Sequence, residues 1–361
     1  MSTLRGSTRC LHASNRWRHF MAAGLPKILV EDVNRRAADA KQFFQECNAR
    51  YEHDLAQVVE DIAQRAGRHR QFILLAGPSA SGKTTTSLKL KAGLMARGIR
   101  AVTVSLDDFF KDRAETPLQP DGKPDYESPA ALDLDLFTQV TEELLEKEKA
   151  SFPIFDFKLA RRGEKMRRLE LPQGSVAVVE GLHALNPLVA SCLPDERVFR
   201  LYVSVSSEFA DADGNVLLSA RDIRLVRRVL RDYRFRASSA AHTLELWEDV
   251  CRGEDAFVRP FKPLADRTLD TVFACEPCLF AGMALWHFES AWEDGPFTHE
   301  ARRLVAAMKQ FPRISQRVIP PACLLREFLG GSLYLNKKTI RRRRGYGSRP
   351  HAAGQAPATG G

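Results

Sequence analysis

One eight-residue segment constrains this chain more than any other. Residues 77–84 read Gly-Pro-Ser-Ala-Ser-Gly-Lys-Thr, which fits the pattern G-x-x-x-x-G-K-[ST] in full. The apolar run Phe72–Ala76 precedes the segment, and the helix-compatible stretch Thr84–Arg97 follows it. Glycines at these positions let successive backbone N–H groups point inward, where the start of the helix adds positive potential. The motif and its context therefore predict a phosphate-binding loop between a strand and a helix.

This loop predicts which residues would hold a nucleotide. Lys83 is placed to reach the β- and γ-phosphates, and the Thr84 hydroxyl is placed to ligate Mg²⁺. The residues expected to bind the nucleotide are Gly77, Pro78, Ser79, Ala80, Ser81, Gly82, Lys83, Thr84 and Thr85. A chance glycine turn before a helix is the alternative, and the matched strand and helix disfavour it.

Outside the loop, apolar strands alternate with helical segments. Strands are expected at Phe72–Ala76, Ala101–Ser105, Val176–Val179, Val198–Val203 and Thr271–Phe273, and helices near Ala130–Lys147 and Ala220–Tyr233. Because the strands are mostly apolar, they fit a parallel sheet that is buried on both faces. The predicted fold class is α/β, a P-loop NTPase fold with a mostly parallel sheet and helices on both faces.

The formal net charge of +9 is confined to the two ends of the chain. Residues 1–30 carry five basic side chains and residues 337–361 carry seven, with no acidic residue in either segment. The remainder therefore has a net charge of −3. This distribution argues against a basic face on the folded part, and so against nucleic acid as a partner. No apolar stretch is long enough to predict a membrane span.

The same patterns divide the chain into four parts. Residues 1–26 are expected to be a disordered basic leader, with an organellar transit peptide as the alternative. Residues 27–68 are expected to be a helical N-terminal extension, residues 69–330 the α/β domain, and residues 331–361 a disordered basic tail. A long amphipathic helix over Val33–Ala66 is predicted from the helical spacing of Phe44, Cys47, Tyr51, Leu55, Val58 and Ile62.

The seven cysteines predict an intracellular protein, because an odd number at irregular spacing does not suit a disulfide framework. Cys275 and Cys278 have the spacing of metal ligands, but no second pair accompanies them, which favours two ordinary thiols. The expected localisation is cytoplasmic, and the acid-free N-terminus leaves a mitochondrion or plastid as the alternative.

Three acidic residues follow predicted strands and bear on the phosphate chemistry. Asp107 and Asp108 come after Ala101–Ser105, and Glu180 comes after Val176–Val179. Parallel strands bring their C-terminal ends to one edge of the sheet, where the phosphate loop also lies. A carboxylate there could accept a proton from an attacking hydroxyl, although a turn or helix cap would also explain the pair. Glu180 is the single acid after its strand and could hold a metal-bound water. No further residue nearby is evident that would activate water for hydrolysis, which favours phosphoryl transfer to a bound acceptor.

An arginine-rich helix is the third candidate element. Its basic residues are Arg221, Arg224, Arg227, Arg228, Arg231, Arg234 and Arg236. Arg224, Arg228 and Arg231 share one helical face. A solvated surface is one interpretation, and a lid that neutralises charge on the γ-phosphate and excludes water is the other.

In their order along the chain, these motifs resemble those of the uridine kinase and phosphoribulokinase family of P-loop kinases. The resemblance spans roughly residues 70–280 and rests on Gly77–Thr84, Ser105–Phe110, Tyr126–Pro129, Pro153–Phe157, Glu180–Leu182 and Arg224–Asp232. It identifies residues 69–330 as a P-loop kinase domain with an Arg-rich helical lid.

The resemblance also implies roles for the matching residues. It places the general base on Asp107 and the other catalytic groups on Lys83, Arg228 and Arg231. It assigns substrate binding to Glu127, Phe110, Phe155, Phe157, Arg162 and Arg236. Thr84, Glu180 and Asp107 are the implied metal-side residues.

Two departures from the family pattern concern the acceptor. Phe155 and Ala160 stand where uridine–cytidine kinases carry a tyrosine and a histidine, and Glu127 stands where they carry an aspartate. Together with the ending Leu325–Gly331, these features are similar to a bacterial-type branch of uridine-kinase-like nucleoside kinases. The resemblance implies a nucleoside acceptor without specifying its base.

The expected function is therefore that of an ATP- and Mg²⁺-dependent kinase that phosphorylates a ribose 5′-hydroxyl. The expected partner is a small-molecule acceptor, and a homo-oligomer is compatible with the sequence. Another small alcohol, such as a sugar phosphate or pantothenate, is the alternative acceptor. A nucleotide-regulated protein that binds RNA or a membrane through its basic tails is the alternative from a different class.

Overall fold

The computed structural model describes residues 24–335, with gaps at 68, 120–121, 123, 157–158, 160 and 292–296. Most of the expected leader (1–26) and tail (331–361) therefore lies outside the described residues, as do Phe157 and Ala160. Among the residues described, no helix is both long and apolar enough to cross a membrane.

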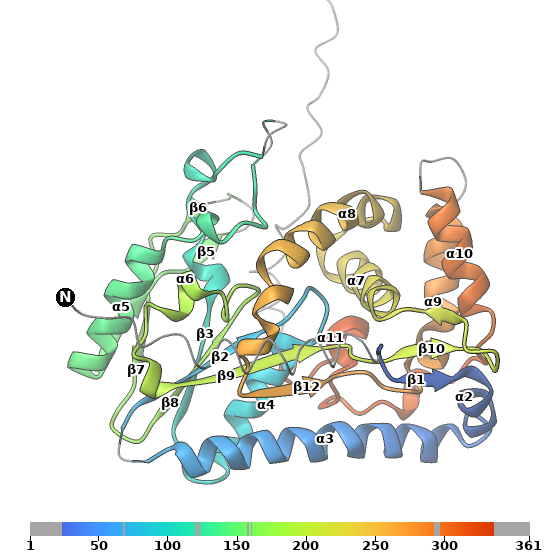
Figure 1. The fold of residues 1–361 in the computed structure, drawn as a ribbon, viewed down its shortest axis with the longest axis horizontal. Helices are drawn as coiled ribbons and strands as arrows, with labels where there is room; N and C mark the ends of the chain where they lie inside the picture. Colours follow the sequence, from blue (N-terminus) through green and yellow to red (C-terminus); the bar gives the residue numbers. More distant parts are fainter. Residues whose placement is uncertain are drawn as a thin grey trace, which may run out of the picture.

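Five parallel strands form the central sheet (Figure 1). They are β2 (Gln71–Ala76), β3 (Ala101–Ser105), β8 (Val176–Glu180), β9 (Val198–Ser204) and β12 (Arg267–Asp270), in the spatial order β12-β9-β2-β8-β3. The predicted α/β fold is confirmed, and four of the five strands lie at the predicted apolar runs. Because β2 is central, the loop that follows it has a strand end on either side.

The prediction of a fifth strand at Thr271–Phe273 is wrong. β12 ends at Asp270, whose carboxylate accepts hydrogen bonds from the backbone N–H groups of Val272 (3.1 Å) and Ser206 (2.9 Å). This turn takes the chain out of the sheet before the apolar residues begin. Thr271 and Phe273 are buried in the core instead.

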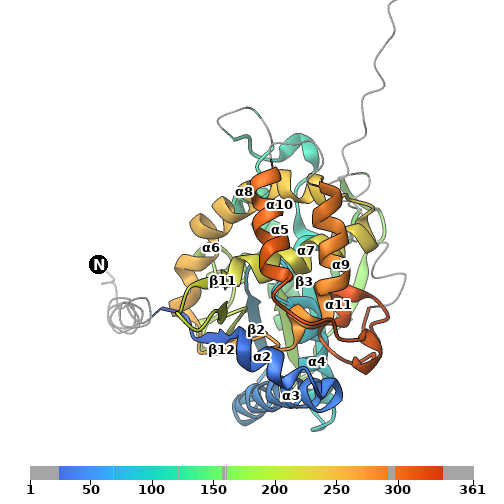
Figure 2. The same ribbon diagram turned by 90° about the vertical axis from the view of Figure 1, so that its right-hand side faces the viewer.

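The described part of the chain contains ten helices. They are α2 (Val30–Arg36), α3 (Ala40–Arg65), α4 (Lys83–Met95), α5 (Leu134–Lys147), α6 (Pro187–Ala190), α7 (Ala220–Arg236), α8 (Ala240–Phe257), α9 (Glu276–Ala291), α10 (Thr298–Met308) and α11 (Arg326–Leu329). Figures 1 and 2 both show α4 between the sheet and α3, which runs along the outside of the molecule.

Four strands of the central sheet contribute side chains to two hydrophobic cores, one on either face of the sheet, whereas β12 contributes Leu269 to one of them. In β2, Ile73 and Leu75 belong to a core that also includes α3, α4, α7, α9 and α10. Phe72 and Leu74 belong to a second core with α5 and α6. This alternation explains why nearly every residue of β2 is apolar.

Short antiparallel pairings flank the central sheet. β10 (Glu208–Ala210) pairs with β11 (Val216–Leu218) and, in parallel, with β1 (Lys27–Leu29). β4 (Lys149–Phe152) pairs with β7 (Arg167–Glu170), and β5 (Phe155–Asp156) pairs with β6 (Arg161–Arg162). The hairpin β5–β6 carries two of the residues predicted to bind the acceptor.

The predicted single helix over Val33–Ala66 is two helices, α2 and α3. Asp39 interrupts them: its carboxylate accepts a hydrogen bond from the backbone N–H of Gln42 (3.0 Å) and caps α3. All six apolar residues that predicted the helix lie in α3 and are buried. Among them, Tyr51 shares a hydrogen bond with Thr86 of α4 (3.0 Å), so α3 packs into the same core as the sheet.

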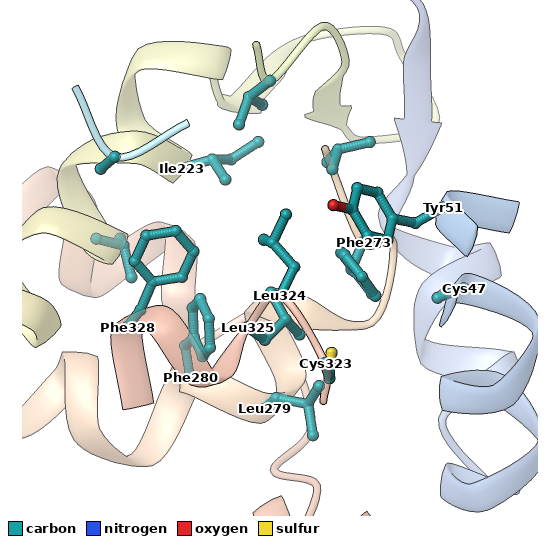
Figure 3. Packing of buried hydrophobic residues seen from close by; sticks show 14 of the residues in the cluster. Cys47, Tyr51, Ile223, Phe273, Leu279, Phe280, Cys323, Leu324, Leu325 and Phe328 are labelled. Atoms are coloured by element: carbon teal, nitrogen blue, oxygen red, sulfur yellow. The ribbon is translucent and has the colours of Figure 1, made fainter. Parts of the chain in front are cut away.

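The C-terminal segment 323–329 returns to the middle of the molecule. Figure 3 shows its side chains among those of α9 and near α3, with Phe328 beside Phe280 and Leu324 above Leu325. Leu324, Leu325 and Phe328 are each fully buried. This segment therefore belongs to the main core rather than to a peripheral tail.

Candidate active site

The phosphate loop, residues 77–84, leaves the C-terminal end of β2 and enters α4. A Cβ atom on Gly77 would lie 1.9 Å from the carbonyl oxygen of Val203 in β9. Gly82 has a φ of 88°, and a Cβ atom there would lie 2.7 Å from Cδ1 of Leu324. Both motif glycines therefore occupy positions that a side chain would disturb.

One cavity over the loop gathers most of the predicted site residues. The predicted residues that line it are Ser79, Ala80, Gly82, Lys83, Thr84, Asp107, Phe110, Glu127, Glu180, Arg228, Arg231 and Arg236. They come from the loop, from the ends of β3 and β8, from the segment before α5, and from α7. Gly77, Pro78, Ser81 and Thr85 belong to the loop or to α4 and do not line the cavity.

Lys83 is half-buried, and its Nζ donates a hydrogen bond to the carbonyl oxygen of Pro78 (2.8 Å). Burial lowers the pKa of Lys83 to about 8, although the carboxylates of Glu180 and Glu254 favour its charged form. A partly desolvated ammonium at this position would gain from an anionic ligand, because a phosphate would compensate the charge.

Asp107 and Asp108 lie on one turn of 3₁₀-helix, Leu106–Phe109, directly after β3. Asp107 lines the cavity, whereas Asp108 does not. Asp108 accepts a hydrogen bond from the backbone N–H of Phe155 (3.3 Å) and lies 4.0 Å from Arg167. Of the two carboxylates, Asp107 is thus the one that faces the phosphate loop.

Glu180 is the last residue of β8 and pairs in register with Ser105 of β3 and Leu75 of β2. Its Oε1 accepts a hydrogen bond from the Ser105 hydroxyl at 3.2 Å, and the side chain is 5% exposed. This contact fixes a carboxylate between the phosphate loop and the turn that carries Asp107.

Glu127 is half-buried and lines the same cavity as the phosphate loop. Protein atoms around its carboxylate raise its pKa to about 7, and the nearby Arg228 guanidinium partly offsets that effect. Glu127 therefore titrates in the neutral range, where it can either accept or donate a hydrogen bond.

Three arginines of α7 are buried: Arg224, Arg227 and Arg228. The solvated-surface interpretation of this helix is therefore wrong for these residues. Nη1 of Arg224 donates to the carbonyl oxygen of Ser79 (3.0 Å), and Nη1 of Arg228 donates to the Ser79 hydroxyl (2.8 Å). Their guanidinium groups hold the first half of the phosphate loop in place.

Arg227 connects the phosphate loop to α9 through buried polar contacts. It forms an ion pair with Glu276 of α9 (2.8 Å) and donates to the carbonyl oxygen of Thr271 (2.6 Å). The Thr271 hydroxyl in turn donates to the carbonyl oxygen of Ser81 (2.8 Å). Burial raises the pKa of Glu276 to about 7, while Arg227 favours its ionised form. The loop thus rests on a buried ion pair.

Asp232 organises the arginines that line the cavity. Its carboxylate oxygens lie 2.8 Å from Arg231 and 3.4 Å from both Arg228 and Arg236. Burial would raise the pKa of Asp232, but Arg231, Arg236 and Arg228 outweigh it and hold the pKa well below its usual range. One carboxylate therefore keeps three guanidinium groups together at the cavity wall.

The other two predicted acceptor residues that the structure describes are Phe155 and Arg162. Phe155 packs on Phe110, with ring centroids 5.9 Å apart. Nη1 of Arg162 donates to Asp133 (2.8 Å), and its backbone N–H donates to Asp112 (2.9 Å). Neither Phe155 nor Arg162 lines the cavity.

Two carboxylates at the loop were missed by the sequence interpretation. Glu254 of α8 is 0% exposed and accepts a hydrogen bond from the backbone N–H of Ser79 (2.6 Å). Glu327 of α11 lines the cavity and accepts one from the backbone N–H of Thr85 (2.9 Å). A signal existed for Glu254, since it follows Gly253 in a helix interior, where glycine is unfavourable. Neither is recognisable from spacing to the loop, because both contacts are made in tertiary structure.

The donor set suits a magnesium nucleotide. The Ser81 hydroxyl is buried and has no hydrogen-bond partner among the described residues, but it does not line the cavity. Thr84 and Glu180 line the cavity and offer the oxygen ligands that Mg²⁺ prefers. Mg²⁺ usually binds through one or two protein oxygens together with substrate phosphates, and the site fits that arrangement.

Comparisons with known proteins agree with this geometry. The model of the Phosphoribulokinase / Uridine kinase family matches residues 72–275. The chain is similar to the uridine kinase of Bacillus pumilus, with 32% identity over 53% of this chain and 82% of the relative. It is also similar to the uridine kinase of a Geobacillus species, with 30% identity over 55% of this chain and 85% of the relative.

Among solved structures, the chain resembles one described as a possible uridine kinase from Bacillus stearothermophilus. The TM-score is 0.43 at 16% sequence identity, and the match covers 61% of this chain and 98% of the other.

Proposed function

Because the chain belongs to the phosphoribulokinase / uridine kinase family and is therefore an ATP-dependent phosphotransferase, we propose that it transfers the γ-phosphate of ATP to the 5′-hydroxyl of a nucleoside. The observation that carries this proposal is the shared cavity: the phosphate-loop residue Lys83, the strand-end acid Asp107 and the acid Glu127 all line it.

The site residues divide into a donor side and an acceptor side. On the donor side, Lys83 and the loop N–H groups would bind the phosphates, and Arg228 and Arg231 would neutralise charge that develops on the transferred group. When bound, Mg²⁺ would be held by Thr84 and Glu180 and would supply positive charge that offsets the charge of the phosphates.

On the acceptor side, Glu127 would bind a ribose hydroxyl, and Asp107 would take the proton of the attacking 5′-hydroxyl. Asp107 suits that role because it faces the loop from the end of β3. Holding the hydroxyl in line with the phosphate would supply much of the rate enhancement, since phosphoryl transfer depends mainly on positioning and electrostatics.

The wall near the acceptor supports weak discrimination between bases. Phe110 lines the cavity and packs against Phe155 with the two rings tilted by 59°, and neither ring can donate or accept a directional hydrogen bond. Strong discrimination usually requires such bonds and can then reach about 10⁴-fold. We therefore propose that several nucleosides are accepted.

A panel of acceptors tests the proposal. Purified protein is incubated with Mg-ATP and individual nucleosides, and the monophosphate product is detected by mass. Phosphorylation of two or more nucleosides at comparable kcat/KM supports both parts. A strict preference for one pyrimidine would show that other residues read the base. Phosphorylation of a sugar phosphate or pantothenate alone would keep the kinase and overturn the nucleoside acceptor.

A further inference from the structure

The structure assigns a positioning role to Gly253 and Glu254 of α8: we propose that this pair sets the acceptor-side Glu127 and the phosphate loop at a fixed relation to one another. The inference rests on the proposed function for the role of Glu127 and extends it to two residues of a helix that supplies no lining residue of the cavity.

The backbone of Gly253 packs directly against the side chain of Glu127, and no space for a side chain remains between them. A Cβ atom on Gly253 would lie 2.4 Å from Cβ of Glu127 and 3.1 Å from its Cγ. Real Cβ atoms do not approach that closely, so α8 can pack against Glu127 only where residue 253 is glycine. Glycine in a helix interior is less stable than alanine, and the close approach of Glu127 explains why glycine is present at this position.

The next residue of the helix, Glu254, binds the phosphate loop on the donor side of the site. Oε1 of Glu254 accepts hydrogen bonds from the backbone N–H of Ser79 (2.6 Å) and from Nη1 of Arg224 (2.8 Å). The same Arg224 nitrogen also donates to the carbonyl oxygen of Ser79 (3.0 Å). Both polar groups of the Ser79 backbone are thus held by one buried ion pair between α7 and α8.

Adjacent residues on one rigid helix therefore contact the two halves of the site. A displacement of α8 would disturb Glu127 and Ser79 together, whereas a side chain at position 253 would press directly on Glu127. Misplacement of a reacting partner by about 1 Å can cost about 10²-fold in rate. The pair thus fixes the acceptor against the donor without touching either substrate.

Gly253→Ala is the main test, and Gly282→Ala is its matched control. Gly282 also lies inside a helix, α9, but a Cβ atom there would meet nothing closer than Cδ of Arg313 at 3.9 Å. We expect Gly253→Ala to lower kcat/KM for the acceptor by about 10²-fold with the Kd of Mg-ATP unchanged, and Gly282→Ala to change neither. Equal loss of donor and acceptor affinity, or wild-type acceptor kinetics, would overturn the proposal.

A double variant separates positioning from general packing. Glu127→Gly removes the three atoms nearest to a Cβ at position 253, so adding Gly253→Ala to it should cause little further loss of activity or thermal stability. This cycle also covers the case in which Gly253→Ala alone does not fold: the double variant should then fold. If it fails to fold as well, the assigned contact is wrong.

Glu254→Gln tests the donor half. Glutamine keeps an acceptor oxygen for the Ser79 N–H but loses the charge that faces Arg224, so the Kd of Mg-ATP should rise by about tenfold with acceptor KM affected less. An unchanged Kd would show that Glu254 does not position the loop.

A spectroscopic readout keeps this inference separate from the proposed function. If the wild-type protein phosphorylates no nucleoside, the acceptor role of Glu127 is wrong. The contact between Glu127 and Gly253 can still be tested, because ¹³C NMR titration of the Glu127 carboxyl carbon reports its pKa. Gly253→Ala should shift that titration from about 7 toward the ordinary range, and Gly282→Ala should not. A titration that is unaffected by Gly253→Ala would overturn the assignment.

Discussion

The direction of the side chain distinguishes two adjacent aspartates at this site, Asp107 and Asp108. Asp107 faces the cavity, and Asp108, one residue further on, binds the backbone of Phe155 and lies near Arg167. Neighbouring residues on a 3₁₀ turn point in different directions, so equal chemistry does not give equal access.

Asp107→Asn should therefore cut phosphoryl transfer by about 10²–10⁴-fold, the usual loss when a general base is removed. Asparagine keeps the size of the side chain but cannot take the proton. The Kd of Mg-ATP, measured by calorimetry, should change little, because Lys83 and the loop amides hold the phosphates. Asp108→Asn is the matched control and should be far milder; if it is the more damaging change, the base has been placed on the wrong residue.

Glu127 predicts a pH dependence of acceptor use. Its pKa is raised to about 7, so its carboxylate is protonated over much of the range below neutrality. If the carboxylate form binds the acceptor hydroxyl, kcat/KM for the acceptor should fall about tenfold per pH unit below 7 and level off above it. The ratio of wild type to Glu127→Gln, measured from pH 5.5 to 8.5, isolates this titration. A ratio that is constant with pH would contradict the assignment.

At the scale of elements, the phosphate loop is held by its neighbours rather than by its own sequence. Arg224 and Arg228 of α7 and Glu254 of α8 all contact Ser79 of the loop. Glu327 of α11 contacts the backbone of Thr85, the first residue after the loop. The buried ion pair between Arg227 and Glu276 connects α7 to α9 next to the loop.

Glu276→Ala should consequently destabilise the protein by about 3–5 kcal/mol, because it leaves the Arg227 charge buried and unpaired. The exposed Asp255 pairs with Arg221 and Arg259 and is the control: Asp255→Ala should cost about 1 kcal/mol or less. Urea denaturation of the two variants measures the difference. Equal losses would mean that Arg227 finds another partner or reaches water when Glu276 is absent.

At the scale of the whole molecule, the chain closes on itself around the site. The segment 323–329 lies more than forty residues beyond the part matched by the family model, yet Leu324 packs on Gly82 and Glu327 binds the Thr85 N–H. Helix α3, which precedes the matched part, packs on α4 from the other side. Segments at both ends of the described chain therefore stabilise the phosphate loop and its helix.

Two truncations distinguish this core segment from the basic tail. Ending the chain after residue 335 should leave thermal stability and turnover near wild type, whereas ending it after residue 322 should lower the melting temperature sharply, because buried Leu324, Leu325 and Phe328 leave the core. Differential scanning fluorimetry and the nucleoside assay measure both. Loss of turnover on removal of residues 336–361 alone would favour a function that depends on the tail.

The sequence by itself determined the features that depend on local spacing. The G-x-x-x-x-G-K-[ST] motif between an apolar strand and a helix located the phosphate loop, since backbone conformation there follows from the glycines. Four strands and the helix α7 were predicted because burial on both faces, or on one face, leaves a periodic pattern. The approximate positions of Asp107 and Glu180 followed from the rule that parallel strands end at one edge.

Tertiary structure decided what local spacing cannot express. Asp270 ended β12 before Thr271, and Asp39 divided the N-terminal helix, each through a side-chain hydrogen bond that competes with regular structure. Whether α7 would be solvated depended on partners far away in sequence, chiefly Glu254 and Glu276. The contacts of Glu327 and Gly253 with the site arise because distant segments are packed against the same loop, and no period in the sequence records that proximity.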